Sequence, residues 1–545
     1  MSGSEQNLPP AKRVWRSRSG FSYVAILVMT MILTTLALAF ISRSGILSSA
    51  VLGRHDRIQA EYLADTAIQH GLWAIRNDAG SIKNDTTYYM HSLAGGRYGY
   101  RVRVPTSTTF ATIAAIGQYG DFVARQSYVA FMGVPGFQER LYTAYWSDYL
   151  VIGGVAYPGN PGPKWREWTD STWTDDAFAY ADPAEALWVE LEGSPRSNEM
   201  VMGVQKSDGT VEVSVFDGSA WGNRMGFPSY GGEQCFDLAY ESVTGDALLL
   251  AGTDGYNAVM YSVWNGAAWA PNPPDTAFQL NKPEAHVVKM ASHPETDEIL
   301  AVVLNGDDEL EAFVWDGDGF SSEGKIDDKI PLLNTGAFDL AYERLSGHAL
   351  VVYGEQGNNK SRYREWTGTG FDGAKDIWDF GRQGQLFRLE PDPTDNYMLL
   401  AAGDGFSDLH LVVWNGSAWT DHREVETNLP SDQVVSFDVA WRSTGDEALF
   451  AWGKQSYGKI FYLEWTKGTG FSSIPVKSGP AISMNIHRLR LQSVARTDET
   501  VCLVVDNLKT LVSSVHDDGG FGAGEAVTYV NTSGSFVFDM AVTRP

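Results

Sequence analysis

The chain has 545 residues, of which 12% are aromatic, 20% are charged and 56 are glycine. This length exceeds one ordinary hydrophobic core, and the composition favours a β-rich, turn-rich protein with several domains or a long repeat array over a disordered one. A formal net charge of −26 excludes a role that depends on binding nucleic acid, because such a chain repels polyanions.

The first predicted element is an apolar segment behind a basic stretch. Four basic residues lie between residues 12 and 18, and no charged residue occurs from Phe21 to Ile41. A helix of this length would extend roughly 31 Å, about the hydrocarbon thickness of a bilayer. The basic flank predicts that residues after Arg43 lie outside the cytoplasm. A cleaved secretion signal is the alternative, because residues 42–49 contain several small residues.

The helical pattern continues beyond the apolar segment. Residues 46–75 contain no proline, and small or apolar residues recur at helical spacing from Ala60 to Ile75. We therefore predict one long helix over residues 21–77. Three strand-like segments separated by turn residues follow, and they predict a small antiparallel sheet within residues 78–136 that covers the apolar face of the helix.

These N-terminal residues resemble type IV pilin-like proteins, in particular the PilX-type and GspK-type minor pilins. The resemblance spans residues 12–135. It is carried by the leader ending at Gly20, the hydrophobic segment that starts at Phe21, and the stretches AEYLADTAIQHGLW, GGRYGYRVRV and ATIAAIGQYGDFVARQSYVAF.

The resemblance implies a maturation and assembly pathway. Residues 1–20 would be a leader, a prepilin peptidase would cleave between Gly20 and Phe21, and the new Phe21 amine would be methylated. The precursor would wait in the bacterial inner membrane with its later residues extracytoplasmic, and would then join other pilins or pseudopilins through its helix. Major pilins carry glutamate where this chain has Ala25, which implies a minor tip or priming subunit. A type IV pilus and a type II secretion pseudopilus both fit.

Residues 137–545 contain a repeat with a period of about 50 residues. Each copy has an aromatic residue, or histidine in the last copy, before a turn, as in VWNGAAW and REWTGTGF. These positions are Trp168, Phe216, Trp264, Trp315, Trp366, Trp414, Trp465 and His516. Each copy reads as four short strands, so eight copies predict an eight-bladed β-propeller. We expect the aromatics to pack between blades, with sugar stacking as the alternative.

A longer period indicates how the ring closes. The strands FDLAY, FDLAY, FDVAW and FDMAV begin at residues 236, 338, 437 and 538, so a two-blade unit is used four times. The first blade lacks such a strand, whereas the last strand has no blade after it. We therefore predict that the C-terminal strand completes the first blade.

The same strands supply the candidate site residues, Asp237, Asp339, Asp438 and Asp539. In an alternating strand, these carboxylates point away from the Phe and Leu side chains. Two interpretations are open. The ring would bind a hard cation such as Ca²⁺ at one mouth of the channel, or each carboxylate would accept hydrogen bonds from a neighbouring turn or backbone N–H. Residues 305–308 and 316–319 resemble calcium-loop fragments but lack EF-hand spacing, so we predict turns.

The sequence contains none of the common catalytic patterns, neither a metalloprotease HExxH nor a GxSxG nucleophile turn nor a phosphate-binding loop. The stretch that begins at Asp217, DGSAW, resembles only part of a sialidase turn, and its serine and spacing do not match. Cys235 and Cys502 are too few and too far apart in sequence for a disulfide scaffold or a cysteine metal site. We expect no catalytic residues and no required cofactor.

These patterns together predict a minor pilin whose propeller serves adhesion or scaffolding at a filament tip or cell surface. Its expected ligand is a surface glycan or a protein. Two alternatives differ in class: a membrane-anchored extracytoplasmic propeller hydrolase of the glycosidase type, and an anchored structural protein that never enters a filament.

Overall fold

The computed structural model divides the chain into two compact units, Met1–Val134 and Pro135–Pro545. The residues that it describes are 59–60, 62–64, 66–68, 70, 88–93, 95–103, 110–119, 122–131, 139–152, 155–169, 172–229, 234–253, 255–331, 336–430, 435–443, 445–472, 477–482, 486–495, 498–506, 508–517, 519–529 and 538–543. Gly20, Phe21, Ala25 and Ile41 lie outside these residues, as do the predicted leader and apolar segment.

The first unit contains one antiparallel sheet with the order β1-β2-β3-β4. Its strands are β1 (Tyr89–Leu93), β2 (Gly96–Arg103), β3 (Phe110–Tyr119) and β4 (Phe122–Phe131). Helical residues between 59 and 70 pack on it, and their buried side chains are Ala60, Leu63, Ala64 and Ala67. A Cβ at Gly117 would collide with the backbone of Ala60 and Ala64, so glycine permits this close approach.

The packing of a helical face against a small antiparallel sheet agrees with the sequence prediction for the described residues. Most of the predicted helix over residues 21–77 lies outside these residues. Within the part of the chain that the structure describes, no helix is long and apolar enough to cross a membrane. The predicted inner-membrane precursor finds no support among these residues, and the apolar segment at 21–41 lies outside them.

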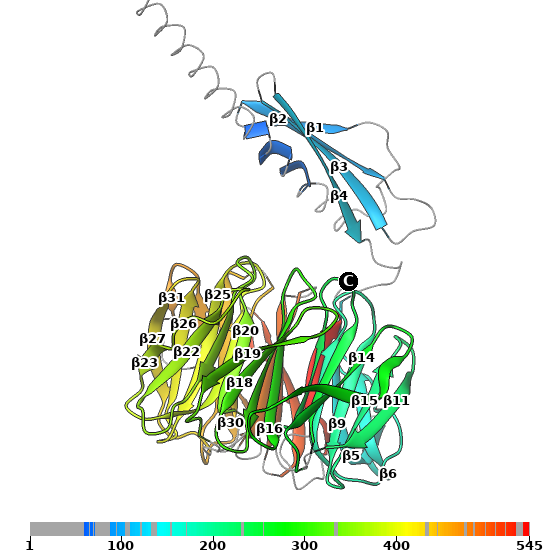
Figure 1. Cartoon of the computed structure of the whole chain (residues 1–545), viewed down its shortest axis with the longest axis vertical. Coiled ribbons are helices and arrows are strands. Elements are labelled where there is room, and N and C mark those ends of the chain that lie inside the picture. Colours follow the sequence, from blue (N-terminus) through cyan, green and yellow to red (C-terminus); the bar gives the residue numbers. More distant parts are fainter. Residues whose placement is uncertain are drawn as a thin grey trace, which may run out of the picture. The chain divides into compact units, whose positions relative to one another are not determined.

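In the second unit, the described strands form eight sheets of four or five strands (Figure 1). We number these sheets as blades 1 to 8. Blade 1 contains β5 (Arg140–Ile152), β6 (Val155–Glu167), β7 (Ala177–Phe178) and the C-terminal β38 (Phe538–Thr543). Its order is β38-β5-β6-β7, and Phe538 pairs with Tyr145 in an antiparallel ladder. The last strand is thus the first strand of blade 1.

The other blades follow in chain order. Blade 2 contains β8 (Ala186–Gly193), β9 (Met200–Lys206), β10 (Thr210–Phe216) and β11 (Trp221–Pro228). Blade 3 contains β12 (Phe236–Tyr240), β13 (Ala247–Gly252), β14 (Ala258–Trp264) and β15 (Trp269–Gln279). Blade 4 contains β16 (Ala285–Ser292), β17 (Ile299–Asn305), β18 (Leu310–Trp315) and β19 (Phe320–Asp327). Blade 5 contains β20 (Phe338–Tyr342), β21 (Ala349–Tyr353), β22 (Lys360–Trp366) and β23 (Lys375–Asp379). Blade 6 contains β24 (Gly384–Pro391), β25 (Tyr397–Asp404), β26 (Leu409–Asn415) and β27 (Trp419–Glu426). Blade 7 contains β28 (Phe437–Trp441), β29 (Glu447–Gly453), β30 (Lys459–Thr466), β31 (Gly470–Phe471) and β32 (Lys477–Ala481). Blade 8 contains β33 (Ile486–Val494), β34 (Glu499–Asp506), β35 (Thr510–Asp517), β36 (Gly520–Phe521) and β37 (Glu525–Tyr529).

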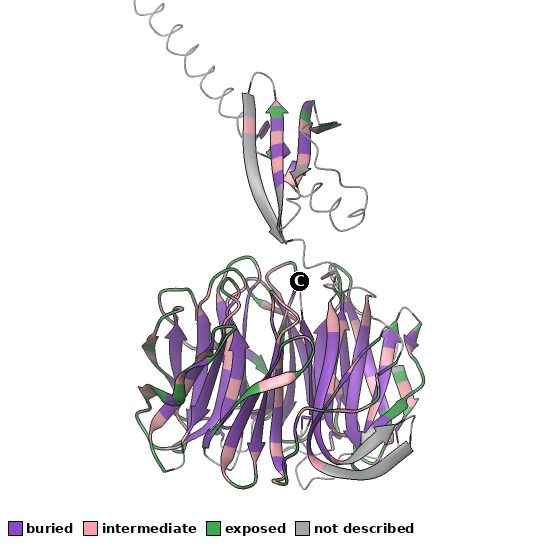
Figure 2. Cartoon of the chain, turned by 90° about the vertical axis from the view of Figure 1, so that its right-hand side faces the viewer, coloured by how far each residue is buried: buried purple, intermediate pink, exposed green. Residues whose placement is uncertain are grey.

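The first strands of the blades surround the axis of a propeller. They contact one another in the order β38, β8, β12, β16, β20, β24, β28 and β33, and β33 contacts β38 again. Figure 2 shows that the sheets are mostly buried and that exposure concentrates in the connecting turns. The prediction of a β-propeller is confirmed by this topology.

The repeated aromatic side chains lie between the sheets. Trp168, Phe216, Trp264, Trp315, Trp366, Trp414 and Trp465 are all buried. Several indole N–H groups donate to a carboxylate of the preceding blade: Trp315 to Glu241 at 2.6 Å, Trp366 to Glu298 at 2.9 Å and Trp414 to Glu343 at 2.5 Å. Burial of large rings together with these hydrogen bonds holds neighbouring sheets together.

Candidate functional site

The four repeated aspartates join each odd-numbered blade to the blade that follows it. Each Oδ2 accepts a hydrogen bond from a backbone N–H on the first strand of that next blade. The four bonds are Leu191 to Asp539 at 3.1 Å, Met290 to Asp237 at 2.6 Å, Leu389 to Asp339 at 2.9 Å and Leu491 to Asp438 at 2.9 Å. The sequence left a cation ring and structural hydrogen bonds open, and the geometry matches the second interpretation.

This pairing identifies a second set of equivalent positions. The residue before each N–H donor lies at the same place on β8, β16, β24 or β33. These residues are Glu190, Lys289, Arg388 and Arg490. Three of the equivalent positions therefore carry a positive charge, and the fourth carries a carboxyl group.

A cavity of about 230 Å³ lies among these first strands. Its lining comes from β8, β16, β20, β24, β28 and β33 and from β12 with the preceding Gln234. Nine of the fifteen lining residues are charged: Glu190, Glu192, Asp237, Lys289, Asp339, Arg388, Glu390, Asp438 and Arg490. The centre of the propeller is therefore a polar space rather than a hydrophobic core.

Two of the three cations are held by aspartates of the next blade. The Lys289 ammonium group donates to Asp339 Oδ1 at 3.1 Å and to the backbone oxygen of Phe338 at 2.8 Å. Arg490 forms an ion pair with Asp539 at 3.0 Å. Burial lowers the pKa of Lys289, and the Asp339 carboxylate opposes that shift.

Arg388 differs from these two cations. Among the residues that the structure describes, it has no ion-pair partner within 4 Å, and its Nε is buried without a hydrogen-bond partner. Burial and then the Arg388 charge lower the pKa of Lys289, while Asp339 opposes them, so the charge of Arg388 reaches its neighbours around the axis. Arg388 thus presents to the cavity a guanidinium group that no carboxylate of the described residues pairs with at 4 Å or less.

The blade 2 and blade 3 side of the cavity is acidic. Glu190 Oε1 accepts hydrogen bonds from Gln234 at 2.9 Å and from the Trp188 indole at 2.5 Å. Burial, followed by the Asp539 charge, raises the pKa of Glu190 well above its usual range. Burial also raises the pKa of Asp237 to about 7, although the N–H groups of Met290 and Leu238 oppose the shift.

The arrangement of the acidic residues also bears on the predicted cation ring, which remains a prediction. No group of three or more His, Cys, Asp or Glu side chains that could hold a metal ion occurs in the described part of the chain. The turn at 316–319 is closed by Asp316 Oδ1, which accepts from the N–H groups of Asp318 at 3.0 Å and Gly319 at 2.9 Å. Its carboxylate is thus already bound by its own backbone.

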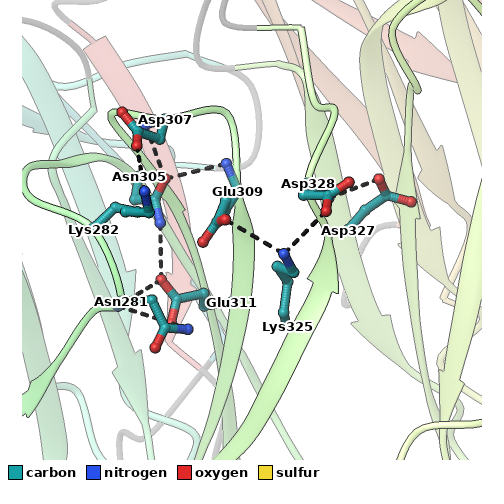
Figure 3. A network of polar contacts seen from close by, with 9 residues as sticks. All are labelled: Asn281, Lys282, Asn305, Asp307, Glu309, Glu311, Lys325, Asp327 and Asp328. Atoms are coloured by element: carbon teal, nitrogen blue, oxygen red, sulfur yellow. Dashed lines mark hydrogen bonds and ion pairs between the residues drawn. The ribbon is translucent and has the colours of Figure 1, made fainter.

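The turn at 305–308 is part of a larger polar network, which Figure 3 shows. Asn305 Oδ1 accepts from the N–H of Asp307 at 3.0 Å, and Asp307 pairs with Lys282 at 2.9 Å. Glu311 accepts from the side chains of Asn305 and Asn281, each at 2.8 Å. These contacts tie the turn to the segment between β15 and β16, which is a structural role.

Reasoning from the sequence missed Glu190, Lys289, Arg388 and Arg490. A usable signal exists, because each of these charged residues stands between apolar residues of a strand: VEL, VKM, FRL and LRL. A charge at the same place in four buried strands predicts a shared polar environment. Alignment of the even-numbered repeats to one another would have revealed this position.

No protein-family model matches the chain, and no curated protein matches it. Similar solved structures include lectins. The BP39L lectin of Burkholderia pseudomallei has 10% identity and a TM-score of 0.46, over 63% of this chain and 100% of the lectin. The Aleuria aurantia lectin, described as a six-bladed β-propeller with a fucose recognition mode, has 12% identity and a TM-score of 0.33, over 55% and 97%. The AofleA protein of Arthrobotrys oligospora has 10% identity and a TM-score of 0.34, over 66% and 92%.

These findings correct the predicted identity. No family model matches the chain, so none supports the resemblance to pilins. The small residues that carried the resemblance pack on a local sheet in the described region. The minor-pilin function, with its pilin and peptidase partners, is therefore unsupported.

Proposed function

We propose that the chain is a non-catalytic binding protein that takes a small, charged ligand into the central cavity of its propeller. One observation carries this proposal: nine charged side chains line a cavity of about 230 Å³. Buried charges are stable only when they are paired, hydrogen-bonded or bound to a ligand. Lys289 and Arg490 are paired within the protein, whereas Arg388, which is partly exposed, has no ion-pair partner within 4 Å among the described residues and a buried Nε without a hydrogen-bond partner.

The size of the cavity limits the ligand. Pockets for drug-sized molecules usually span about 300–1,000 Å³, so this cavity suits an amino acid or a monosaccharide rather than a polymer. Two of the similar lectins are described with fucose or fucosides, and monosaccharides therefore belong among the compounds to be tested.

A thermal-shift screen on the full-length chain tests the proposal. The panel contains neutral and charged monosaccharides, amino acids and small phosphates. A ligand of the folded state raises the unfolding midpoint in proportion to the logarithm of its concentration. Gln492 lines the cavity, so Gln492→Trp should fill it and abolish the shift. Gln492→Ala, which leaves the space open, is the matched control. The proposal fails if no compound shifts the midpoint, or if the shift survives Gln492→Trp.

A further inference from the structure

The turns between the second and third strands of the blades lie on one face of the propeller. In the even-numbered blades these turns share one backbone: a residue with positive φ follows the tip residue, and its N–H donates to the carbonyl three residues earlier. The tip residues are Asp208 in blade 2, Asp307 in blade 4, Phe406 in blade 6 and Leu508 in blade 8. One turn structure therefore carries polar tips on one part of the ring and apolar tips on another.

The apolar tips are exposed and belong to neighbouring blades. Phe406 is 58% exposed and Leu508 is 60% exposed, and Tyr457, in the turn of blade 7 between them, is 51% exposed. A single exposed apolar side chain is ordinary on a soluble protein, whereas several that gather on one face mark an interaction surface. We call these three residues the blade 6–8 tips.

The fold does not require apolar residues at these tips. In blade 6, Asp404 Oδ1 accepts from the N–H groups of Phe406 at 2.8 Å and Asp408 at 3.0 Å. In blade 4, Asn305 Oδ1 accepts from the equivalent N–H groups, at 3.0 Å and 3.1 Å, and the tip there is Asp307. Because the same turn forms around an aspartate tip, the exposure of Phe406 is not explained by the turn itself.

Each of the blade 6–8 tips has a cation beside it. The Arg382 guanidinium carbon lies 4.0 Å from the centre of the Phe406 ring, the Lys454 ammonium nitrogen lies 5.4 Å from that of Tyr457, and Lys509 directly follows Leu508. Lys454 is paired with Glu426 at 2.8 Å.

The acidic residues of the same three turns are less exposed than these cations. Asp404 and Asp506 are buried beneath the tips, and Asp408 is half-buried. In the three turns and the connection that leads into blade 6, the exposed charged residues are Arg382, Lys459, Lys509 and Asp379. The surface around the apolar tips is therefore mainly basic, although the whole chain is acidic.

This combination suits an anionic lipid surface better than a protein partner. A stable protein interface uses roughly 20–30 residues on each side, whereas three tips on separate turns offer much less continuous apolar surface. A bilayer accepts separate apolar side chains at its interface, and neighbouring cations bind its phosphates. A second copy of the chain that met the patch with its own patch would bring like charges together, which is unfavourable.

We propose that the blade 6–8 tips dock onto an anionic lipid surface. Phe406, Tyr457 and Leu508 enter the boundary between headgroups and acyl chains, while Arg382 and Lys509 bind lipid phosphates. The exposed Asp208 and Asp307 tips keep the blade 2 to 4 part of this face out of the bilayer. The propeller lies on the lipid surface through these turns and does not span it.

A polarity-sensitive fluorophore at Gln455→Cys, in the exposed turn of blade 7, tests the proposal on the full-length chain. The native Cys235 and Cys502 are buried, so the label goes to the new cysteine. We expect vesicles of phosphatidylcholine with phosphatidylglycerol to shift its emission to shorter wavelength. Ser207→Cys, in the exposed turn of blade 2, is the matched label and should not shift. A local label is needed because the apolar segment at 21–41 could itself bring the chain to a vesicle.

Variants test the tips one by one. Phe406→Asp places in blade 6 the residue type that blade 4 carries, and it should raise the lipid concentration for half of the shift at least about tenfold. Leu508→Asp should act similarly, and Lys509→Gln should weaken the preference for phosphatidylglycerol. Tyr256→Asp is the matched control, because Tyr256 is 70% exposed in the turn of blade 3, outside the patch. Thermal unfolding of each variant checks that the fold is retained.

Several results would overturn the proposal. These are no shift at position 455 with any vesicle, an equal shift at position 207, or a shift that survives Phe406→Asp unchanged. Sedimentation of the wild type and of Phe406→Asp without lipid tests the other occupant. A dimer that the substitution dissociates would assign the tips to a second copy of the chain and would also overturn docking on lipid.

Discussion

The interface between the blades and the lining of the central cavity differ in how similar their residues are from one repeat copy to the next. Between the blades, a large buried ring recurs in every copy, from Trp168 to Trp465, with histidine in the last. At the cavity, one equivalent position is occupied by Glu190, Lys289, Arg388 and Arg490. Packing fixes size and shape at the interface, because neighbouring sheets must fill the same gap each time. The residues that line the cavity do not pack against a neighbouring sheet in this way, so this constraint on size and shape does not apply to them and their charges differ from blade to blade.

Removal of β38 should have the largest effect, because it breaks the ring that both regions share. Deletion of residues 538–545 exposes the first-strand edge of blade 1 and removes the buried side chains of Phe538, Met540 and Val542. At roughly 1.5–3 kcal/mol for each large side chain, we expect a loss of at least about 5 kcal/mol. Circular dichroism during heating measures it, with deletion of residues 544–545 as the control. An unchanged midpoint would show that the ring does not depend on this strand.

Within the cavity, Asp339→Ala should destabilise the protein by about 3 kcal/mol. The substitution removes the hydrogen bond from Leu389 and leaves the Lys289 ammonium group buried without its carboxylate. Urea unfolding measures the change. The double variant Asp339→Ala/Lys289→Met should recover part of the loss, because it no longer buries an unpaired charge. Equal losses in the single and double variants would contradict this account of the pair.

The pH dependence of stability tests the acidic blade 2 and blade 3 side of the cavity. The folded-state pKa of Asp237 is raised to about 7, above an unfolded value near 4, so the folded protein holds this proton more tightly. Its contribution is fully present below pH 4 and is lost as the pH rises through 7. We expect wild-type stability to fall by about 2 kcal/mol between pH 5 and pH 8, and Asp237→Asn to reduce that fall. Denaturant unfolding at both pH values checks it, and identical profiles would refute it.

The smallest expected effect concerns the interface between blades 5 and 6. Trp414→Phe keeps a ring but removes the indole N–H that donates to Glu343 at 2.5 Å, so we expect a loss of about 1–2 kcal/mol. Trp419→Phe on the same blade is the matched control, because the Trp419 indole nitrogen has no hydrogen-bond partner among the residues that the structure describes. Urea unfolding should separate the two variants; equal losses would mean that ring size alone matters at this interface.

The propeller could be predicted from the sequence because the residues that pack between and within the blades recur in each repeat copy. The aromatic positions and the FD strands recur at fixed intervals, and the same pattern placed the C-terminal strand in blade 1. The cavity was harder to predict, because Glu190, Lys289 and Arg388 differ in charge and their shared position emerges only when the even-numbered repeats are aligned with one another. In the structure, the hydrogen bonds from the next residues show the same alignment. In the first unit, small residues at helical spacing and the strand-like segments after them predicted a helical face covered by a small sheet, and the described residues show this packing.

Ring closure by β38 also affects how the chain folds during its synthesis. Thr143 donates to the backbone oxygen of Asp539, a residue 396 positions later in the chain. At a synthesis rate of roughly 5–20 residues per second, about 20–80 s separate the appearance of these two residues at the ribosome. Until then the inner edge of β5 has no partner strand, and an unpaired edge is a template for wrong pairing. The growing chain must therefore keep this edge from other strands for most of the synthesis of the propeller.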